Sequence, residues 1–226
     1  PRFSEDLDFL LLAPDPKFDW APFLKILTET FEEYGLQPEA ISKERMDKRI
    51  RNAVIKDNSI VNQLDLSFGK RDSRKTLKVK LEIDVHPPAH SVDDFSYLDF
   101  PVDFEIRHQV LASNFALKLH ALLCREYLKG RDWYDFSWYV AQGIFPNLPH
   151  LEAALRQFGP WAGDETLAVN VEWLQTEMTK RIQSIDWNEA KNDVIRFLRP
   201  AEAESLKLWS SRFFESKLSK LVTMHP

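Results

Sequence analysis

The sequence predicts an α+β fold in which a mixed sheet with helices is followed by an all-helical C-terminal part. Two segments, 2–12 and 76–85, alternate between apolar and polar residues, which is the period of a half-buried strand. After residue 148 the apolar residues recur only at helical spacing. We therefore predict an N-terminal α/β core over 1–106 and a helical part over 107–226.

The composition is that of a globular protein, with 44% hydrophobic and 29% charged residues among 226. The net charge is -5, and the sequence contains no long run of charges of one sign. It therefore shows no cluster of basic residues that would indicate nucleic-acid binding. The single cysteine, Cys124, excludes an internal disulfide and lies in an apolar helical run, so we expect a small core residue. No apolar run approaches the roughly 20 residues of a membrane span, and no signal peptide is present, so we expect a cytoplasmic protein without a membrane partner.

The opening strand carries two neighbouring carboxylates. Strict alternation places Ser4, Asp6 and Asp8 on one face, roughly 7 Å apart. Carboxylates this close repel each other, and a divalent cation such as Mg²⁺, which prefers oxygen ligands, would relieve that repulsion. A solvated face of a half-exposed sheet is the alternative, and both interpretations stay open. Because the chain begins inside a strand and without Met, we also expect the natural protein to extend beyond Pro1.

An amphipathic helix is predicted over about 19–34. Asp15 or Asp19 can cap its start, and Gly35 ends it. The polar stretch that follows, to about residue 51, predicts a short helix. The helix stripe expected to face the sheet consists of Phe23, Leu24, Ile26, Leu27 and Phe31.

Strand patterns occupy the middle of the chain. Segment 52–56 is a weak strand candidate, 60–68 is a better one, and 69–73 is a turn. Segment 76–85 is the clearest strand. Its polar face either completes the site begun on the opening strand or is an exposed hairpin edge with alternating charge. That face comprises Lys78, Lys80, Glu82, Asp84 and His86.

A long helix is predicted over 107–129, ending at Gly130. It places Lys118 in the middle of an apolar stripe, which is costly unless the ammonium reaches a carboxylate, a phosphate or water. In the next helix, 131–143, Asp132 and Asp135 are spaced i and i+3, which also suits simple capping of the first turn. Further helices are expected over 149–158, 165–182, 187–198 and 202–221, with Trp161, Trp173, Trp187 and Trp209 at their contacts.

Four segments occur in a fixed order: RFSEDLDF at 2–9, KLEI at 80–83, ALKLHALLCR at 116–125 and KGRDWYDF at 129–136. Together they resemble the AbiEii/AbiGii toxin family of nucleotidyltransferase-like proteins, which are relatives of the DNA polymerase β superfamily. This family occurs in bacterial type IV toxin–antitoxin and phage abortive-infection systems. The resemblance covers about 1–145 and implies a nucleotidyltransferase-like core.

The resemblance also implies a site for a nucleoside triphosphate with Mg²⁺ or Mn²⁺. In that site Asp6, Asp8 and Glu82 hold the metal, and Asp84 lies one step along the same face. The nucleotide is bound by Ser4, Lys118 and Arg131. Asp132 is needed for activity, either orienting Lys118 or acting as a base. Arg125 and Asp135 are secondary candidates.

The implied reaction transfers a nucleoside monophosphate to an acceptor hydroxyl. Some relatives act on tRNA 3′ ends, so tRNA or another RNA is the expected acceptor and a cognate antitoxin an expected partner. Family members also carry a Gly-Gly-Ser/Thr element upstream of the acidic strand, and its expected place precedes Pro1. Two alternatives stay open: a non-catalytic interaction module that keeps the fold, and a metal-dependent phosphodiesterase.

Overall fold

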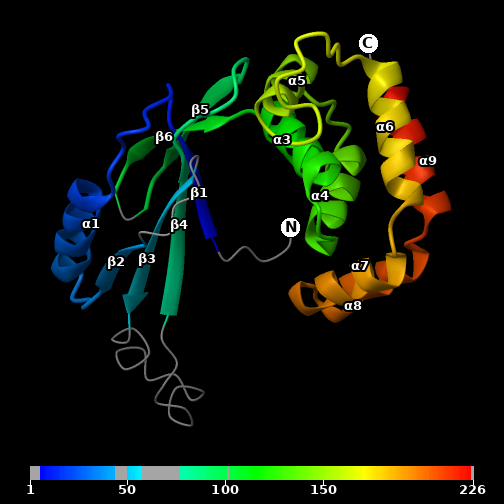
Figure 1. Cartoon of the computed structure of the whole chain (residues 1–226). Coiled ribbons are helices and arrows are strands. Elements are labelled where there is room, and N and C mark those ends of the chain that lie inside the picture. Colours follow the sequence, from blue (N-terminus) through cyan, green and yellow to red (C-terminus); the bar gives the residue numbers. More distant parts are fainter. Residues whose placement is uncertain (1–5, 44–49, 58–76, 101, 225–226) are drawn as a thin grey trace. The chain divides into compact units, whose positions relative to one another are not determined.

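The computed structural model describes residues 6–43, 50–57, 77–100 and 102–224 (Figure 1). The chain forms two compact units, one ending at Pro87 and one beginning at Pro88. Their secondary structure is that of the predicted α+β class, with a mixed sheet in the first unit and mostly helices in the second. The predicted strand 60–68 and turn 69–73 lie outside the described residues.

The first unit is a four-stranded sheet with one helix, α1 (Ala21–Glu33). The strand order is β1-β4-β3-β2, in which β1 and β4 are parallel and the other pairs are antiparallel. The sheet is therefore mixed, as predicted. Its strands are β1 (Asp6–Leu10), β2 (Glu39–Lys43), β3 (Ile50–Asp57) and β4 (Leu77–Asp84).

Alternation in β4 sends Leu81 and Ile83 into the core of this unit, where they meet Ala53 and Ile55 of β3. Helix α1 covers that core with Leu24, and Trp20 closes it at the start of the helix. The opposite face of β4 is left for polar side chains, because successive residues of a strand point to opposite sides.

Helix α1 confirms the predicted element to within two residues at each end. The Asp19 carboxylate accepts a hydrogen bond from the Ala21 backbone N–H at 3.0 Å, and Gly35 follows the helix with a positive φ of 76°. The predicted stripe was wrong in part, since Phe23 and Ile26 are 50% and 61% exposed. One narrow helix face is enough to cover this small core.

The described part of the polar stretch before residue 51 does not form the predicted short helix, because residues Glu39–Lys43 form strand β2. The rest of that stretch, 44–49, lies outside the described residues. Strand β2 pairs antiparallel with β3, from Glu39 opposite Lys56 to Lys43 opposite Asn52. Pairing with a neighbouring strand overrides the weak local preference of a polar segment.

The second unit begins with a two-stranded hairpin, β5 (Asp93–Leu98) and β6 (Phe104–Gln109), which the sequence patterns did not predict. The helices that follow are α3 (Leu111–Cys124), α4 (Gly130–Ala141), α5 (Leu148–Gln157), α6 (Val171–Gln183) and α7 (Trp187–Val194). The chain ends with a 3-10 turn (Ile195–Phe197), α8 (Pro200–Ala203), a second 3-10 turn (Glu204–Leu208) and α9 (Ser211–Val222).

The long helix predicted over 107–129 was wrong at both ends. Its first residues belong to β6, where the Arg107 side chain bonds Asp93 of β5. Its last residues are not helical, since α3 ends at Cys124 and Arg125 is extended. Gly130 therefore opens the next helix instead of ending this one. Similarly, α6 starts at Val171 and not near residue 165, and the predicted helix 202–221 is interrupted before Ser211.

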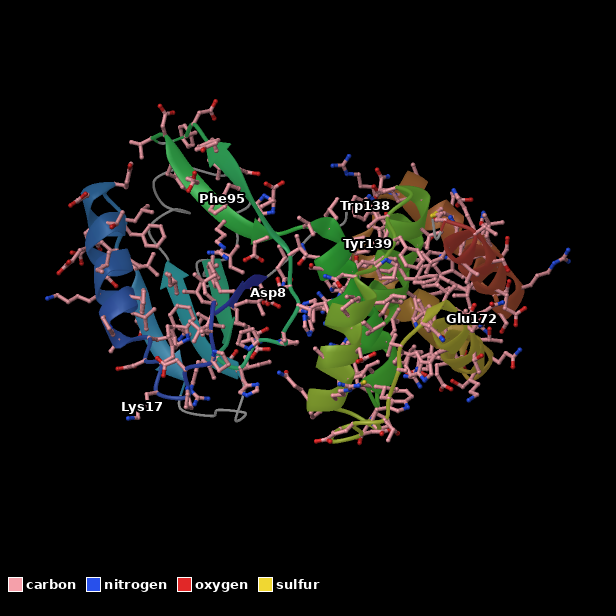
Figure 2. All side chains as sticks on the ribbon, turned by 90° about the horizontal axis from the view of Figure 1, so that it is seen from above. Asp8, Lys17, Phe95, Trp138, Tyr139 and Glu172 are labelled. Atoms are coloured by element: carbon pink, nitrogen blue, oxygen red, sulfur yellow. The ribbon has the colours of Figure 1, made fainter. Side chains whose placement is uncertain are left out.

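The helical core is rich in aromatic contacts. Trp133 packs edge-on against Trp187 and Phe214, with ring centroids 5.0 and 5.2 Å apart. Tyr139, labelled in Figure 2, stacks on Phe115 with centroids 4.6 Å apart. The predicted tryptophan contacts are confirmed: Trp209 is buried, and Trp161, Trp173 and Trp187 pack against the same core.

Cys124 lies at the end of α3 beside the 158–159 backbone. Its Sγ donates a weak hydrogen bond to the Phe158 carbonyl oxygen at 3.7 Å, and partial burial raises the pKa of the thiol to about 11. The thiol is therefore protonated at neutral pH, as expected of a packing residue and not of a nucleophile.

At Gly130, helix α4 lies directly against the backbone of α7. A Cβ at this position would lie 2.0 Å from the Ala190 carbonyl oxygen. We expect Gly130→Ala to lower the free energy of unfolding by about 3 kcal/mol, because two helix backbones must separate. Chemical denaturation measures this change. Gly163→Ala is the matched control, since that position has a positive φ but open space, and should cost only about 1 kcal/mol. Equal losses in the two variants would contradict the packing account.

Candidate functional site

The three carboxylates predicted as metal ligands lie on neighbouring strands of the first unit. In the parallel pair, Asp8 of β1 is opposite Glu82 of β4, and Asp6 is opposite Lys80. Residues paired in this way point to the same side of a sheet, so Asp6, Asp8 and Glu82 share one face. Asp8, labelled in Figure 2, is exposed, and Asp6 is half-buried. We call these three residues with Lys80 the strand cluster.

Lys80 neutralises part of the strand cluster. Its ammonium forms an ion pair with the Glu82 carboxylate. Partial burial disfavours the charged form of Lys80 and lowers its pKa. The hydrogen bond from Lys80 to Glu82 and the negative charges of Glu82, Asp6 and Asp8 act in the opposite direction. Their effect is larger than that of burial, so the pKa of Lys80 is raised. A single ammonium therefore interacts with all three carboxylates. The sequence pattern placed Lys80 on this face but did not identify it as their partner.

The chemistry of the strand cluster suits a hard cation such as Mg²⁺, because its donors are carboxylate oxygens. Within the described ranges, no three His, Cys, Asp or Glu side chains are close enough together to hold a metal ion. Asp6, Asp8 and Glu82 are therefore too far apart as they stand. To hold a cation they would have to approach one another, and Lys80 would have to release Glu82. Asp84, the further candidate on β4, accepts a hydrogen bond from the His86 backbone N–H at 2.8 Å. Ser4 lies outside the described residues.

A second cluster lies in the helical unit, where α3 faces α4. Asp132 is 3% exposed and is held by two cations: Lys118 Nζ is 3.6 Å from one carboxylate oxygen, and the Arg125 guanidinium bonds the other. Asp135, one turn further along α4, lies 3.1 Å from Lys118 Nζ. We call Lys118, Arg125, Asp132 and Asp135 the helix cluster. It confirms that Lys118 reaches a carboxylate from within its apolar stripe.

The end of α3 positions Arg125 in the helix cluster. Its extended backbone turns the chain out of the helix, and Arg181 of α6 fixes this turn by donating to the carbonyl oxygens of Leu122 and Arg125 at 2.9 and 2.8 Å. Arg131, the predicted nucleotide contact, has its guanidinium over the Phe197 ring, 4.3 Å from the ring centroid. Nothing in the sequence pattern indicated Arg181, because it is more than 50 residues from its partners.

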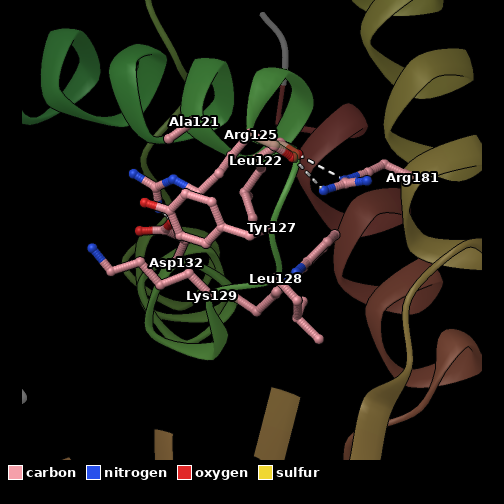
Figure 3. A pocket seen from close by; sticks show the side chains of 9 residues that line it. Ala121, Leu122, Arg125, Tyr127, Leu128, Lys129, Asp132 and Arg181 are labelled. Carbon is pink, nitrogen blue, oxygen red and sulfur yellow. Dashed lines mark hydrogen bonds and ion pairs between the residues drawn. The ribbon is translucent and has the colours of Figure 1, made fainter. Parts of the chain in front are cut away.

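Three cations and a tyrosine line a small pocket at this end of α3 (Figure 3). The pocket has a volume of about 10 Å³. Lys129 is one of its lining residues, and burial lowers the pKa of this lysine. The charge of Asp132 opposes this effect, whereas the positive charges of Arg125, Arg131 and Lys118 add to it. Its lining residues are Ala121, Leu122, Arg125, Tyr127, Leu128, Lys129, Asp132, Trp133 and Arg181.

A buried histidine links α5 to the chain that enters the hairpin. His150 is fully buried; its Nδ1 donates to the Ala89 carbonyl oxygen at 2.7 Å, and its Nε2 faces the Gln109 amide nitrogen at 3.4 Å. This arrangement fits a neutral ring whose Nε2 accepts a hydrogen bond. Burial lowers the pKa of His150, and His90 adds a smaller effect in the same direction. The hydrogen bond to Ala89 and the negative charge of Asp93 raise the pKa but do not cancel the effect of burial.

His150 should make stability depend on pH. Because its pKa is lower in the folded protein, the unfolded chain binds more protons, and stability falls as the pH drops below about 6.5, the value of an unperturbed histidine. We expect His150→Gln to be less stable at pH 7 but to lose less stability than the wild type between pH 7 and 5. Urea titrations between pH 7 and 5 measure how the free energy of unfolding of each protein changes with pH. The same change in the wild type and in His150→Gln would contradict the assignment of a lowered pKa to His150.

No helix in the part of the chain that the structure describes is long and apolar enough to cross a membrane. Neither the curated proteins nor the solved structures include a significant match to this chain. The family model described as nucleotidyl transferase AbiEii toxin, type IV TA system, matches residues 1–214. This match includes both the strand cluster and the helix cluster. The chain therefore belongs to the AbiEii family of nucleotidyl transferase toxins from type IV toxin–antitoxin systems.

Proposed function

We propose that this protein is a Mg²⁺-dependent nucleotidyltransferase that transfers a nucleoside monophosphate from a nucleoside triphosphate to a hydroxyl of tRNA. The observation that carries the proposal is the strand cluster, in which three carboxylates share one face of two parallel strands. Such a set of oxygen donors supports metal-assisted phosphoryl chemistry. The family also suggests a cognate antitoxin as partner, and we propose the bacterial cytoplasm as the site of action.

The reaction forms a bond between the acceptor oxygen and the α-phosphorus and breaks the bond to pyrophosphate. The acceptor hydroxyl gives up its proton to solvent water, and pyrophosphate leaves with the electron pair. When bound, the metal lowers the pKa of the attacking hydroxyl and neutralises charge on the triphosphate. Asp6, Asp8 and Glu82 would hold it, while Lys118 supplies a point charge for a phosphate.

The helix cluster favours a positioning role for Asp132. Both oxygens of this almost fully buried carboxylate already contact a cation, so neither is free to receive a proton from the acceptor hydroxyl. The same contacts hold the Lys118 ammonium at a defined position. We therefore assign Asp132 the orientation of Lys118 and not proton abstraction.

The test is incubation of the full-length protein with each labelled nucleoside triphosphate, Mg²⁺ and total RNA. We expect labelled RNA with the wild type and none with Asp6→Ala. The proposal fails if no triphosphate gives a labelled product, or if Asp6→Ala labels RNA as well as the wild type does.

The ion pair between Lys80 and Glu82 favours a second candidate, a non-catalytic interaction module. In that case the ammonium would permanently take the place of a metal. Calorimetry separates the two functions: Mg²⁺-dependent binding of a triphosphate supports the enzyme, and no binding supports the module.

A further inference from the structure

The pocket at the end of α3 carries more positive charge than its own carboxylate balances. Arg125, Lys129 and Arg181 line it, and Asp132 is the one acidic residue among the described residues that line it. Asp132 is already bonded to Arg125 and lies within 3.6 Å of Lys118 Nζ. We call this site the Tyr127 pocket, after the tyrosine at its rim.

Two of its cations have no carboxylate partner in the described ranges. The Arg181 guanidinium donates its hydrogen bonds to backbone carbonyl oxygens. Lys129 forms no ion pair with any residue in the described ranges. Lys129 is half-buried among other cations, which disfavours its own charge. An anion bound here would relieve that repulsion, and phosphate oxygens suit both ammonium and guanidinium groups.

Tyr127 adds an aromatic surface beside these charges. Its side chain is 64% exposed, and it is not among the residues that pack against the helical core. The Arg125 guanidinium lies 5.1 Å from the ring centroid, and Figure 3 shows Tyr127 beside Arg125 in the pocket. A ring held by a cation and open to solvent is a stacking surface for a nucleobase.

The volume of the pocket decides what kind of ligand fits. At about 10 Å³ it holds one water-sized group, such as a single phosphate oxygen, and cannot enclose a base and sugar. The ligand must therefore lie across the surface, with its base outside the pocket on the ring. A strand that is anchored at several nucleotides suits this open geometry better than a free nucleotide does.

We propose that the Tyr127 pocket binds one nucleotide of a single-stranded RNA, with a phosphate oxygen at Lys129 and Arg125 and the base stacked on Tyr127. That this RNA is the acceptor strand rests on the proposed function. The binding itself does not, because it requires no triphosphate and no transfer.

The test measures binding of a fluorescent single-stranded RNA of about 10 nucleotides, within the usual site size of such surfaces, by anisotropy without triphosphate. We expect Tyr127→Leu and Lys129→Gln each to weaken binding roughly tenfold, the typical loss of one stacked base or one phosphate contact. Tyr127→Phe should bind as the wild type does, since it keeps the ring. Tyr34→Leu and Lys220→Gln are the matched controls, because Tyr34 is 57% exposed and Lys220 is exposed on α9.

Inorganic polyphosphate is the second probe, since it has phosphates but no bases. Lys129→Gln should weaken its binding, and Tyr127→Leu should leave it unchanged. Thermal unfolding of each variant verifies that the helical unit is folded. Because Tyr127 is mostly exposed, its substitution should not unfold the protein.

The proposal is overturned if the wild type does not bind the RNA, or if the Tyr127 and Lys129 variants bind it as well as the controls do. It is also overturned if these variants lose affinity for a nucleoside triphosphate and not for RNA. None of these results decides whether the protein transfers a nucleotide, because the transfer assay is a separate measurement. Failure of the RNA-binding proposal can therefore be distinguished from failure of the proposed function.

Discussion

Replacing Asp132 with asparagine is expected to lower the free energy of unfolding of the helical unit by about 3 kcal/mol. Asp132 is 3% exposed, and its loss leaves Lys118 and Arg125 with 34% and 25% exposed side chains and no common carboxylate. Removing one partner of a buried ion pair costs about 3 to 5 kcal/mol, and we take the lower end because both cations reach solvent. Calorimetric or urea unfolding measures the change.

Two further variants separate charge from packing in the helix cluster. Asp135→Asn should cost less, about 1 kcal/mol, because Asp135 is more exposed and Lys118 keeps Asp132. Arg125→Met combined with Asp132→Leu should regain part of the stability lost in Asp132→Asn, since it removes both charges. It should not regain transfer, because Lys118 loses the carboxylate that orients it. A double variant as unstable as Asp132→Asn would contradict the ion-pair account.

Replacing Asp8 with asparagine is expected to lower the rate of nucleotidyl transfer by at least about 100-fold, since a bound metal supplies several kcal/mol of transition-state stabilisation. Stability should change by no more than about 0.5 kcal/mol, because Asp8 is exposed. The variant also removes one of the repelling carboxylates around Lys80. Loss of activity without loss of stability is the expected signature of a residue used in the reaction.

The matched control for Asp8 is Glu39→Gln, on an outer strand of the same sheet. Glu39 is exposed, and its weak ion pair with Lys56, at 4.0 Å, contributes little. This variant should transfer at the wild-type rate. If Glu39→Gln and Asp8→Asn lower the rate equally, the effect is one of surface charge and not of metal binding.

The sequence predicted those parts of the fold in which one face of an element is buried. Alternation in β4 places Leu81 and Ile83 in the core, and the same period places Glu82 on the face of Asp6 and Asp8. Hairpin β5–β6 was missed because both of its faces carry exposed apolar residues, among them Phe95 and Leu98, so no alternation is visible. Strand β2 was missed because its pairing, not its composition, makes it a strand.

The contacts within the two clusters were less predictable than their residues. That Lys118 needs an anionic partner follows from its apolar stripe, and the structure supplies Asp132 and Asp135. The pairing of Lys80 with Glu82 and the capping of α3 by Arg181 depend on strand register and on helix packing. No local pattern encodes such contacts.

The position of the label in the product tests the central claim most directly. With the triphosphate labelled at the α-phosphorus, the wild type should label RNA in the presence of Mg²⁺ and not with a chelator. With the label at the γ-phosphorus, all of it should appear in pyrophosphate, and Asp8→Asn should label RNA from neither position. Nucleotidyl transfer by this site would be contradicted by any of three results. These are label in RNA from the γ-phosphorus, no label in RNA from the α-phosphorus, and full labelling of RNA by Asp8→Asn.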